Sequence, residues 1–375
     1  MTIDFLILGG GIAGASAGYF LSERGRVVIL EREDTPGYHS TGRSAALYTE
    51  TYGNAAIRAL TIASGPFFRA PPPGFAEHPL LTPRGAMIAA PAAASERFGT
   101  ALAEARRLAP AVRALTPAEA LALCPVLRPD WPAFAFHEPD AMDMDVHAIH
   151  QGYLRGVRGR GGEIVTSAEV TGLARRNGMW EVATRAGRFS APIVVNAAGA
   201  WADEIAGLAG VRPVGLVPKR RTAFTIELPA GTIARTWPMV IDVDETLYFR
   251  PEAGHLLVSP ADETPMPPCD VQPEELDVAE AAERLETRTT LGVGRVVRRW
   301  AGLRSFVRDK TPVVGHAPEA PGFVWLAGQG GYGIQTSAAM GRVATALATG
   351  DELPAELTAR GLTPAHLLPD RLYDA

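Results

Sequence analysis

The sequence has little cysteine and no long apolar run, and both absences narrow the class of protein. Its two cysteines, Cys124 and Cys269, lie far apart and form no Cys-x-x-Cys pair. This scarcity argues against a disulfide framework or a cysteine metal site and favours a reducing compartment. No segment approaches the roughly 20 apolar residues of a membrane span. No basic segment precedes the first apolar run, so we expect no signal peptide, a cytoplasmic location and at most peripheral contact with the inner membrane.

Positive charge is not in excess either. The formal net charge is −5, and the 36 lysines and arginines are spread along the chain. We therefore expect no basic patch that could hold nucleic acid. A chain of 375 residues, of which 47% are hydrophobic, can bury a large core and is expected to divide into two domains.

The most informative stretch that is present lies near the start of the chain. An apolar run at 5–8 predicts a buried parallel strand, and it leads directly into Gly-Gly-Gly-Ile-Ala-Gly at 9–14. Gly9 would permit a tight turn, Gly11 would let the backbone approach a pyrophosphate, and Gly14 would let a helix pack on the strand. Free N–H groups at the start of that helix would face the anion.

An acidic residue follows at the distance that such a site requires. The helix is predicted to end near Arg24, and a second strand at 27–30 ends at Glu31. A carboxylate at this point can accept hydrogen bonds from both hydroxyls of an adenosine ribose and would repel a 2′-phosphate. Strand, glycines, helix and acid together predict a dinucleotide site, although the glycines do not say which dinucleotide is bound.

Polar residues after the second strand could hold the rest of the dinucleotide. The segment from Ser40 to Ser44 offers hydroxyls, backbone amides and the guanidinium of Arg43, which suit a diphosphate. It could equally be an ordinary loop before a helix. Tyr48 and Tyr52 are four residues apart and are expected to share a helical face, in which case one of them could be simple core.

The remaining pattern predicts an α/β fold with two interleaved domains. Strand patterns recur at 80–90, 163–170, 180–184, 189–196, 221–228, 239–243, 246–250, 255–259 and 323–327, and helical patterns at 95–108, 116–123, 143–156 and 334–347. We expect a Rossmann-like nucleotide domain with a parallel sheet, and a mainly antiparallel substrate domain with helices. The first would comprise 1–80, 143–212 and 300–375, and the second 81–142 and 213–299.

The chain resembles the flavoprotein family of D-amino-acid oxidase (DAO), glycine oxidase and sarcosine oxidase. Within it the likeness is greatest to the bacterial catabolic D-arginine dehydrogenases, and it covers essentially the whole chain. It is carried by the glycine motif, Glu31, Tyr-His-Ser-Thr-Gly-Arg-Ser-Ala-Ala at 38–46, Gln-Gly-Tyr-Leu-Arg-Gly at 151–156, Val-Asn-Ala-Ala-Gly-Ala-Trp at 195–201, Pro-Lys-Arg-Arg at 218–221 and the run 329–341. The resemblance implies FAD, and we expect it to be bound non-covalently, because no cysteine or histidine stands out as a covalent anchor.

The motifs and the resemblance together assign one set of residues to the cofactor. A helix at 334–347 follows a glycine-rich loop, and its first amides could face the charge that reduction places on the N1–C2=O edge of a flavin. The expected cofactor residues are Gly9, Gly11, Ala13, Gly14, Glu31, Arg32, Ser40, Thr41, Arg43, Ser44, Ala45, Ala46, Leu47, Val170, Gly199, Gly330, Gly331, Tyr332, Gly333, Ile334 and Gln335.

Two arginines are candidates for binding a substrate carboxylate. Arg304 lies among apolar residues, where a cation needs a partner, and Arg221 opens an alternating strand. Either guanidinium could hold an α-carboxylate with two parallel hydrogen bonds, or could belong to a structural ion pair. The resemblance makes Arg304 the carboxylate clamp. It adds the other catalytic or substrate-binding residues: Arg221, Tyr52, Tyr248, Gly331 and Gln335.

Two departures from the arginine-type enzymes concern the substrate side chain. Those enzymes have a glutamate where this chain has Ala86, and a histidine where it has Leu47. The loss of the acid would leave an apolar wall, so we expect a broad preference or one for neutral and apolar D-amino acids. Glu50, in a loop that could close over the site, could supply a replacement charge or be a solvated loop acid.

The expected reaction is the oxidative deamination of a D-amino acid. A hydride would pass from Cα to flavin N5, and the imino acid would hydrolyse to a 2-oxo acid and ammonia. A quinone, a similar compound or oxygen would accept the electrons. The alternatives are a glycine- or sarcosine-type amine oxidase and a flavin-binding subunit without turnover. An NAD-dependent dehydrogenase would leave the later glycine segments without a purpose.

Overall fold

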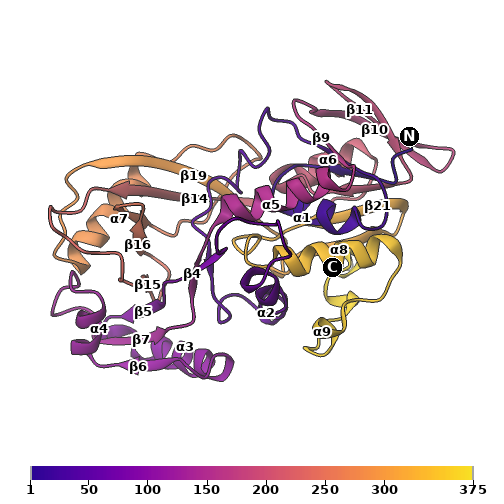
Figure 1. Cartoon of the computed structure of the whole chain (residues 1–375). Helices are drawn as coiled ribbons and strands as arrows, with labels where there is room; N and C mark the ends of the chain where they lie inside the picture. The colour runs from indigo at the N-terminus through magenta and orange to yellow at the C-terminus, as the bar shows by residue number, and fades with distance from the viewer. Residues whose placement is uncertain (1, 374–375) are drawn as a thin grey trace.

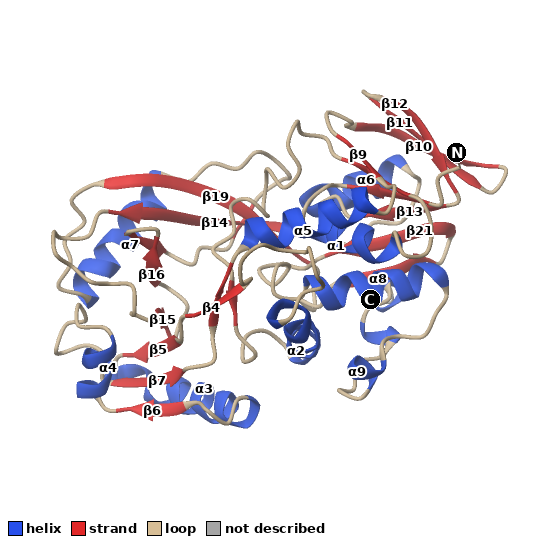
Figure 2. Cartoon of the chain, viewed as in Figure 1, coloured by secondary structure: helices blue, strands red, loops and turns tan. Residues whose placement is uncertain are grey.

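A computed structural model describes residues 2–373, and two large β-sheets dominate it (Figure 1, Figure 2). The first sheet has six strands in the order β20-β21-β13-β1-β2-β9. Five are parallel: β1 (Phe5–Leu8), β2 (Val27–Leu30), β9 (Glu163–Val165), β13 (Ile193–Asn196) and β21 (Ala320–Ala327). β20 (Val313–Ala317) pairs antiparallel with β21. β1 and β2 are buried at every position, as predicted for parallel strands covered on both faces.

Different elements cover the two faces of the first sheet. Ile7 of β1 belongs to a core shared with α1 (Ile12–Leu21), α2 (Ala55–Arg69), α5 (Val146–Gly159) and α8 (Ser337–Thr349). Leu6 and Leu8 point the other way, toward α6 (Ala202–Leu208) and a three-stranded antiparallel sheet of β10 (Val170–Arg176), β11 (Met179–Thr184) and β12 (Gly187–Ala191). The short helix α9 (Ala355–Thr358) follows α8 near the end of the chain.

The second sheet has nine strands in the order β18-β14-β17-β16-β15-β5-β7-β6, with β19 also paired to β14. They are β5 (Ala86–Ala90), β6 (Arg113–Leu115), β7 (Phe134–Glu138), β14 (Val217–Ile226), β15 (Met239–Asp242), β16 (Tyr248–Glu252), β17 (His255–Ser259), β18 (Thr264–Pro265) and β19 (Val296–Phe306). Its pairs are antiparallel except β15 with β5. The predicted combination of a parallel nucleotide sheet and a mainly antiparallel second sheet is therefore confirmed.

Two helices cover the outer face of the second sheet, and a third packs on part of its inner face. The core on the outer side joins Met87, Val240 and Phe249 to α4 (Pro117–Leu123) and α7 (Glu275–Arg288). α3 (Ser95–Leu108) has the predicted bounds. α4 begins one residue after the start of the predicted range 116–123, with Thr116 as its N-cap in a capping box with Glu119. Side chains that alternate with the core residues face inward: some, such as Ala90 and Phe136, pack against α3, and others face the first sheet.

Three local expectations were wrong. Tyr48 and Tyr52 do not share a helix: Tyr48 ends β3 (Leu47–Tyr48), which pairs with β8 (Met142–Met144). β4 (Leu81–Pro83) pairs with β8 and not with β5, so the stretch 80–90 is not one strand pair. The helix expected from 143 begins at Val146 with Asp145 as its N-cap. Asp143 instead lies in β8, where Arg84 contacts it at 2.6 Å. Tertiary pairing overrides local spacing in each case.

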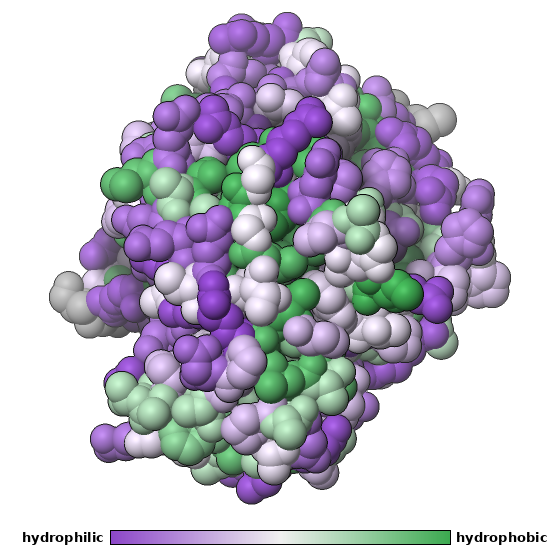
Figure 3. Space-filling view, turned by 90° about the vertical axis from the view of Figure 1, so that its left-hand side faces the viewer, coloured by the Kyte–Doolittle hydropathy of each residue, from purple (hydrophilic) through white to green (hydrophobic). Residues whose placement is uncertain are grey.

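The predicted domain division remains a prediction, with one difficulty at residue 300. That boundary falls inside β19, which pairs with β14 from Val217↔Phe306 to Ile226↔Val296. A division there would cut a paired strand. No helix in residues 2–373 is long and apolar enough to cross a membrane. On the face that carries α4 and α7, apolar residues are interspersed with polar ones (Figure 3), and the exposed ones include Leu276 of α7.

Candidate active site

A cavity of about 800 Å³ lies between the two sheets. It begins at the carboxyl ends of β1 and β2, where parallel sheets bind nucleotides, and reaches the inner face of β5, β7 and β15. Its size is typical of a ligand site. Every residue expected to bind cofactor or substrate lines this cavity, with the single exception of Gly14.

The glycine turn explains why Gly14 does not line the cavity. Gly9 has a φ of +107°, and a Cβ on Gly14 would lie 1.9 Å from the carbonyl oxygen of Gly9. Gly14 therefore lets α1 press against the turn, while Gly11 faces the cavity. The amide of Ile12 donates to Thr41 Oγ1 at 2.9 Å, so one of the N–H groups expected to face an anion already has a partner.

Glu31 is buried at the end of β2, with acceptor capacity to spare. Its Oε2 accepts from the amide of Gly10 at 2.8 Å, and its Oε1 accepts from the amide of Glu33 at 3.0 Å. A carboxylate offers about four acceptor positions, so two remain for a ribose. Burial raises the pKa of the Glu31 carboxyl above its usual value, although both amide bonds act against that shift.

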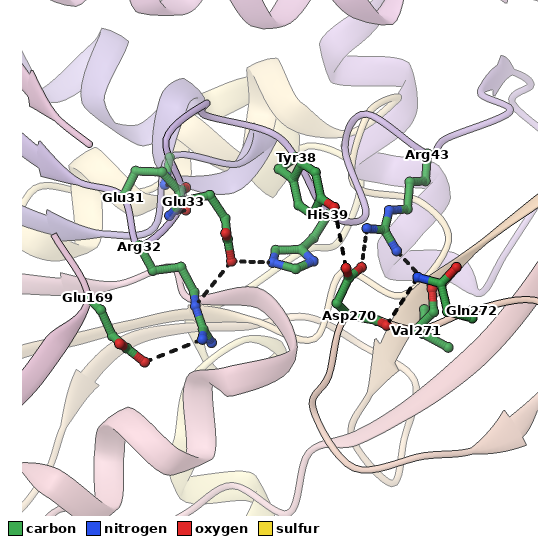
Figure 4. Close-up of polar contacts among 11 residues, drawn as sticks. Glu31, Arg32, Glu33, Tyr38, His39, Arg43, Glu169, Asp270, Val271 and Gln272 are labelled. Atoms are coloured by element: carbon green, nitrogen blue, oxygen red, sulfur yellow. Dashed lines mark hydrogen bonds and ion pairs between the residues drawn. The ribbon is translucent and has the colours of Figure 1, made fainter. Parts of the chain in front are cut away.

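Charged contacts hold the loop that follows β2 from two sides (Figure 4). Glu33 contacts His39 Nε2 at 2.8 Å and Arg32 Nε at 3.3 Å. On the other side, Arg43 Nη1 donates to the carbonyl oxygens of Val271, at 3.0 Å, and Ala301, at 3.1 Å.

Arg43 also pairs with Asp270, a residue that Tyr38 contacts at 3.3 Å. Arg43 lines the cavity, but these protein groups already occupy its guanidinium. This arrangement therefore does not favour the binding of a diphosphate by that guanidinium, which was expected from the sequence. Arg43 instead ties the loop to distant parts of the chain.

The end of the cavity where the substrate is expected is built around Arg304. A Cβ on Gly331 would lie 2.0 Å from Arg304 Nη2, so only glycine lets the guanidinium rest on this backbone. Arg304 Nη2 donates to the hydroxyl of Tyr52 at 3.1 Å, and its side chain is 12% exposed. Tyr248, at the start of β16, lines the same cavity. The four residues come from four separate parts of the sequence, and the fold brings them together.

Glu263 is the carboxylate that pairs with both candidate arginines. Its Oε1 lies 3.3 Å from Arg304 Nη1 and 3.4 Å from Arg221 Nη2, and Lys219 contacts its Oε2 at 2.9 Å. Partial burial would raise the pKa of Glu263, but these three cations hold it below its usual value. The ion-pair alternative for the arginines is thus present in the structure. Three cations share one carboxylate, which leaves positive charge for a second one.

The wall at Ala86 carries aliphatic side chains and also a carboxylate that was not expected. Ala86 pairs with Glu138 of β7, and Glu138 lines the cavity although it is only 2% exposed. Glu50 does not line the cavity; it accepts from Tyr48 Oη at 2.6 Å and from Arg69 at 3.2 Å. Glu138 was not identified from the sequence, because its place beside Ala86 depends on the register of two strands far apart in the chain.

Gln335 contacts both α2 and the loop after β3. Gln335 Nε2 donates to Thr61 Oγ1 at 3.0 Å, and its Oε1 accepts from the amide of Thr49 at 3.4 Å. Thr49 and Thr51 line the cavity and were not identified from the sequence. α8 starts at Ser337 and not at Ile334, so Gly330 to Gln335 form the loop before the helix.

Comparison with known proteins places this arrangement in context. A family model described as FAD dependent oxidoreductase, DAO, matches residues 4–347. Mitochondrial sarcosine dehydrogenase from Mus musculus is 28% identical over 247 residues, which are 61% of this chain and 26% of that protein. The chain thus covers only a minor part of this relative's length.

Solved structures share the fold along nearly the whole chain. L-Proline dehydrogenase from P. horikoshii has a TM-score of 0.81 at 22% identity, over 96% of this chain and 99% of that one. Glycine oxidase from Geobacillus kaustophilus has a TM-score of 0.79 at 22% identity, over 93% and 95%. At these identities the likeness shows the fold alone.

Proposed function

Since the chain belongs to the DAO family of FAD-dependent oxidoreductases, we propose that it oxidises D-amino acids by hydride transfer from Cα to flavin N5. The imino acid product would then hydrolyse to a 2-oxo acid and ammonia, and a quinone-like compound or oxygen would take the electrons. The observation that carries the proposal is the guanidinium of Arg304, which lies with Tyr52 in the same cavity as the glycine-rich turns.

The cavity fits FAD, the cofactor of this family. Glu31 has free acceptor positions at the end of β2, where the adenosine ribose of a dinucleotide binds. Gly11 and Gly199 line the cavity, and a Cβ on Gly199 would meet nothing within 4 Å, so the wall there has room for a bound cofactor. When bound, FAD supplies the electron-accepting ring.

The chain's own residues would bind and orient the substrate. Arg304 would take the α-carboxylate with two parallel hydrogen bonds, and Tyr52, through its hydroxyl, would hold that guanidinium in place. Tyr248 would close the opposite side. If the amine binds in its neutral form, no general base is needed for hydride transfer. The D configuration of the substrate rests on the resemblance of the site sequence.

Oxidation of glycine or sarcosine is the second candidate. The names of two similar proteins, a sarcosine dehydrogenase and a glycine oxidase, favour it. A flavin-binding subunit without turnover fits less well, because such a subunit has no need for Arg304, Tyr52 and Tyr248 around one cavity.

Anaerobic mixing with single amino acids tests the proposal. We expect D-amino acids to bleach the flavin band near about 450 nm, because hydride arrival removes that absorbance. The panel pairs D- with L-forms of arginine, lysine, methionine, leucine and phenylalanine, and adds glycine, sarcosine and L-proline. Bleaching by glycine, sarcosine or L-amino acids alone would discard the D-amino-acid proposal. Return of the colour on admitting air would identify oxygen as an acceptor.

We expect FAD to be released by acid precipitation, because no residue in the cavity is placed as a covalent anchor for the ring. Among the residues that line the cavity in the described chain, His39 is the one histidine or cysteine. Its Nε2 contacts Glu33 at 2.8 Å and its ring lies against that of Trp201, with ring centroids 4.7 Å apart. Yellow colour in the supernatant after trichloroacetic acid would support this, and colour retained in the pellet would contradict it.

A further inference from the structure

Glu138 is a buried carboxylate without a cationic partner. It ends β7, and the row Met239↔Ala86↔Glu138 crosses three neighbouring strands. Residues of this row line the cavity, whereas Met87, one position on, belongs to the core behind the sheet. No lysine, arginine or histidine within residues 2–373 forms an ion pair with Glu138. A buried charge normally has an opposite charge beside it, so the cavity itself is the place for one.

The hydrogen bonds to Glu138 leave acceptor capacity unused. Thr49 Oγ1 lies 2.9 Å from both carboxylate oxygens, and Thr51 Oγ1 lies 2.6 Å from Oε2. With the amide of Glu50, at most three donors serve about four acceptor positions. Burial raises the pKa of Glu138, and the two hydroxyls and the amide act against that shift. A cation in the cavity would complete the set.

The loop that binds Glu138 at one end reaches Arg304 at the other. Thr49 contacts Glu138, and Tyr52, three residues later, contacts Arg304. The Cα atoms of two residues three positions apart lie at most about 11 Å from each other, when the chain is fully extended. The wall between them carries the aliphatic side chains Ile88, Met239 and Ile241. The cavity therefore offers a guanidinium, an apolar stretch and a carboxylate along one loop and the wall beside it.

We propose that Glu138 binds the positively charged end of the substrate side chain, so that the preferred substrates are D-amino acids with a distal ammonium or guanidinium group. This specificity rests on the proposed D-amino-acid oxidation. It replaces the preference for neutral side chains expected from Ala86, because the carboxylate absent at that position is supplied by its neighbour across the sheet.

Binding of unreactive ligands tests the site without turnover. 6-Aminohexanoate is lysine without its α-amino group, and hexanoate is the same acid without the ammonium. Titration of the flavin spectrum of the holoprotein should show 6-aminohexanoate binding about 10- to 100-fold more tightly than hexanoate. Glu138→Gln should abolish this difference. Equal affinity of the two acids for the unmodified protein would overturn the proposal.

Turnover with a pair of substrates that share one aliphatic stem separates cation binding from a structural role of Glu138. D-Norleucine matches D-lysine in its stem but lacks the charge. Glu138→Gln should lower kcat/KM for D-lysine by about 10- to 100-fold relative to D-norleucine. Equal losses for both substrates would show that Glu138 only positions the Thr49–Thr51 loop. The control is Glu50→Gln, a loop carboxylate outside the cavity, which should leave the ratio unchanged.

The role of Glu138 can be tested even if the proposed oxidation proves wrong. If no D-amino acid bleaches the flavin, the proposed oxidation fails, yet the titration with 6-aminohexanoate and hexanoate still decides the role of Glu138. If Glu138→Gln does not fold, Glu138→Asp keeps the charge and withdraws it by one methylene. That variant should favour D-lysine over D-ornithine more strongly than the unmodified protein does, and an unchanged ratio would overturn the proposal.

Discussion

Replacing Arg304 with methionine is expected to lower kcat/KM for a D-amino acid by about 10²- to 10³-fold. The guanidinium is 12% exposed and rests on the backbone of Gly331, so the α-carboxylate would enter a confined space and lose its partner there. Glu263 keeps its contacts with Lys219 and Arg221 in the variant, and the change therefore leaves no protein carboxylate without a cation. Stopped-flow bleaching under anaerobic conditions measures the loss.

Arg299→Met is the matched control for this substitution. Arg299 lies on the same strand, β19, but its side chain is 49% exposed and contacts Glu275 at 3.4 Å. Exposed pairs of this kind contribute about 0–1 kcal/mol, so both activity and stability should stay close to the original. The flavin content of both variants must match that of the unmodified protein. Full turnover by the Arg304 variant would remove this residue from the carboxylate role.

Gly14→Ala is expected to destabilise the protein by about 3 kcal/mol or more, and to reduce the fraction that retains FAD. The added Cβ would lie 1.9 Å from a backbone oxygen of the turn at Gly9, which cannot move aside like a flexible side chain. α1 would have to separate from the turn, and that movement would displace the N–H groups at its start. Urea unfolding and the ratio of flavin to protein absorbance report the two effects.

The control for this prediction is Gly99→Ala. Gly99 is exposed in α3, and a Cβ there would meet nothing within 4 Å. Alanine is favoured over glycine in a helix interior by about 0.5–1 kcal/mol, so this variant should be slightly more stable. If Gly14→Ala bound FAD as well as Gly99→Ala and unfolded at the same urea concentration, close contact between α1 and the turn would not be essential.

The cofactor half of the site could be predicted from the sequence because its signals are local. The strand, the glycines, the helix and Glu31 follow one another within the first 31 residues, and their spacing alone fixes their arrangement. The same holds for the glycine loop ahead of α8, although the helix starts three residues later than expected. The parallel and antiparallel character of the two sheets could be predicted from hydrophobic periodicity. A continuous apolar run indicates a strand buried on both faces, whereas an alternating pattern indicates a strand buried on one face.

The substrate half depends on contacts that sequence spacing does not encode. Ala86 and Glu138 are neighbours only through the register of β5 and β7, and a shift by one residue would turn Glu138 to the other face. Tyr48 and Tyr52 have helical spacing, but Tyr48 is drawn into a strand pair with β8. Nor does the sequence indicate that Arg43 forms an ion pair with Asp270.

The hydrogen bonds from Arg43 to Val271 and Ala301 would also affect how long a cofactor stays bound. These partners follow Arg43 by 228 and 258 residues, so the loop beside the nucleotide is fastened to a distant part of the chain. Freeing the loop means breaking those bonds first, and such a local opening has its own free energy, separate from that of global unfolding. The residence time of a nucleotide bound beside this loop would then depend partly on how often these hydrogen bonds open, and not only on the groups that contact the nucleotide.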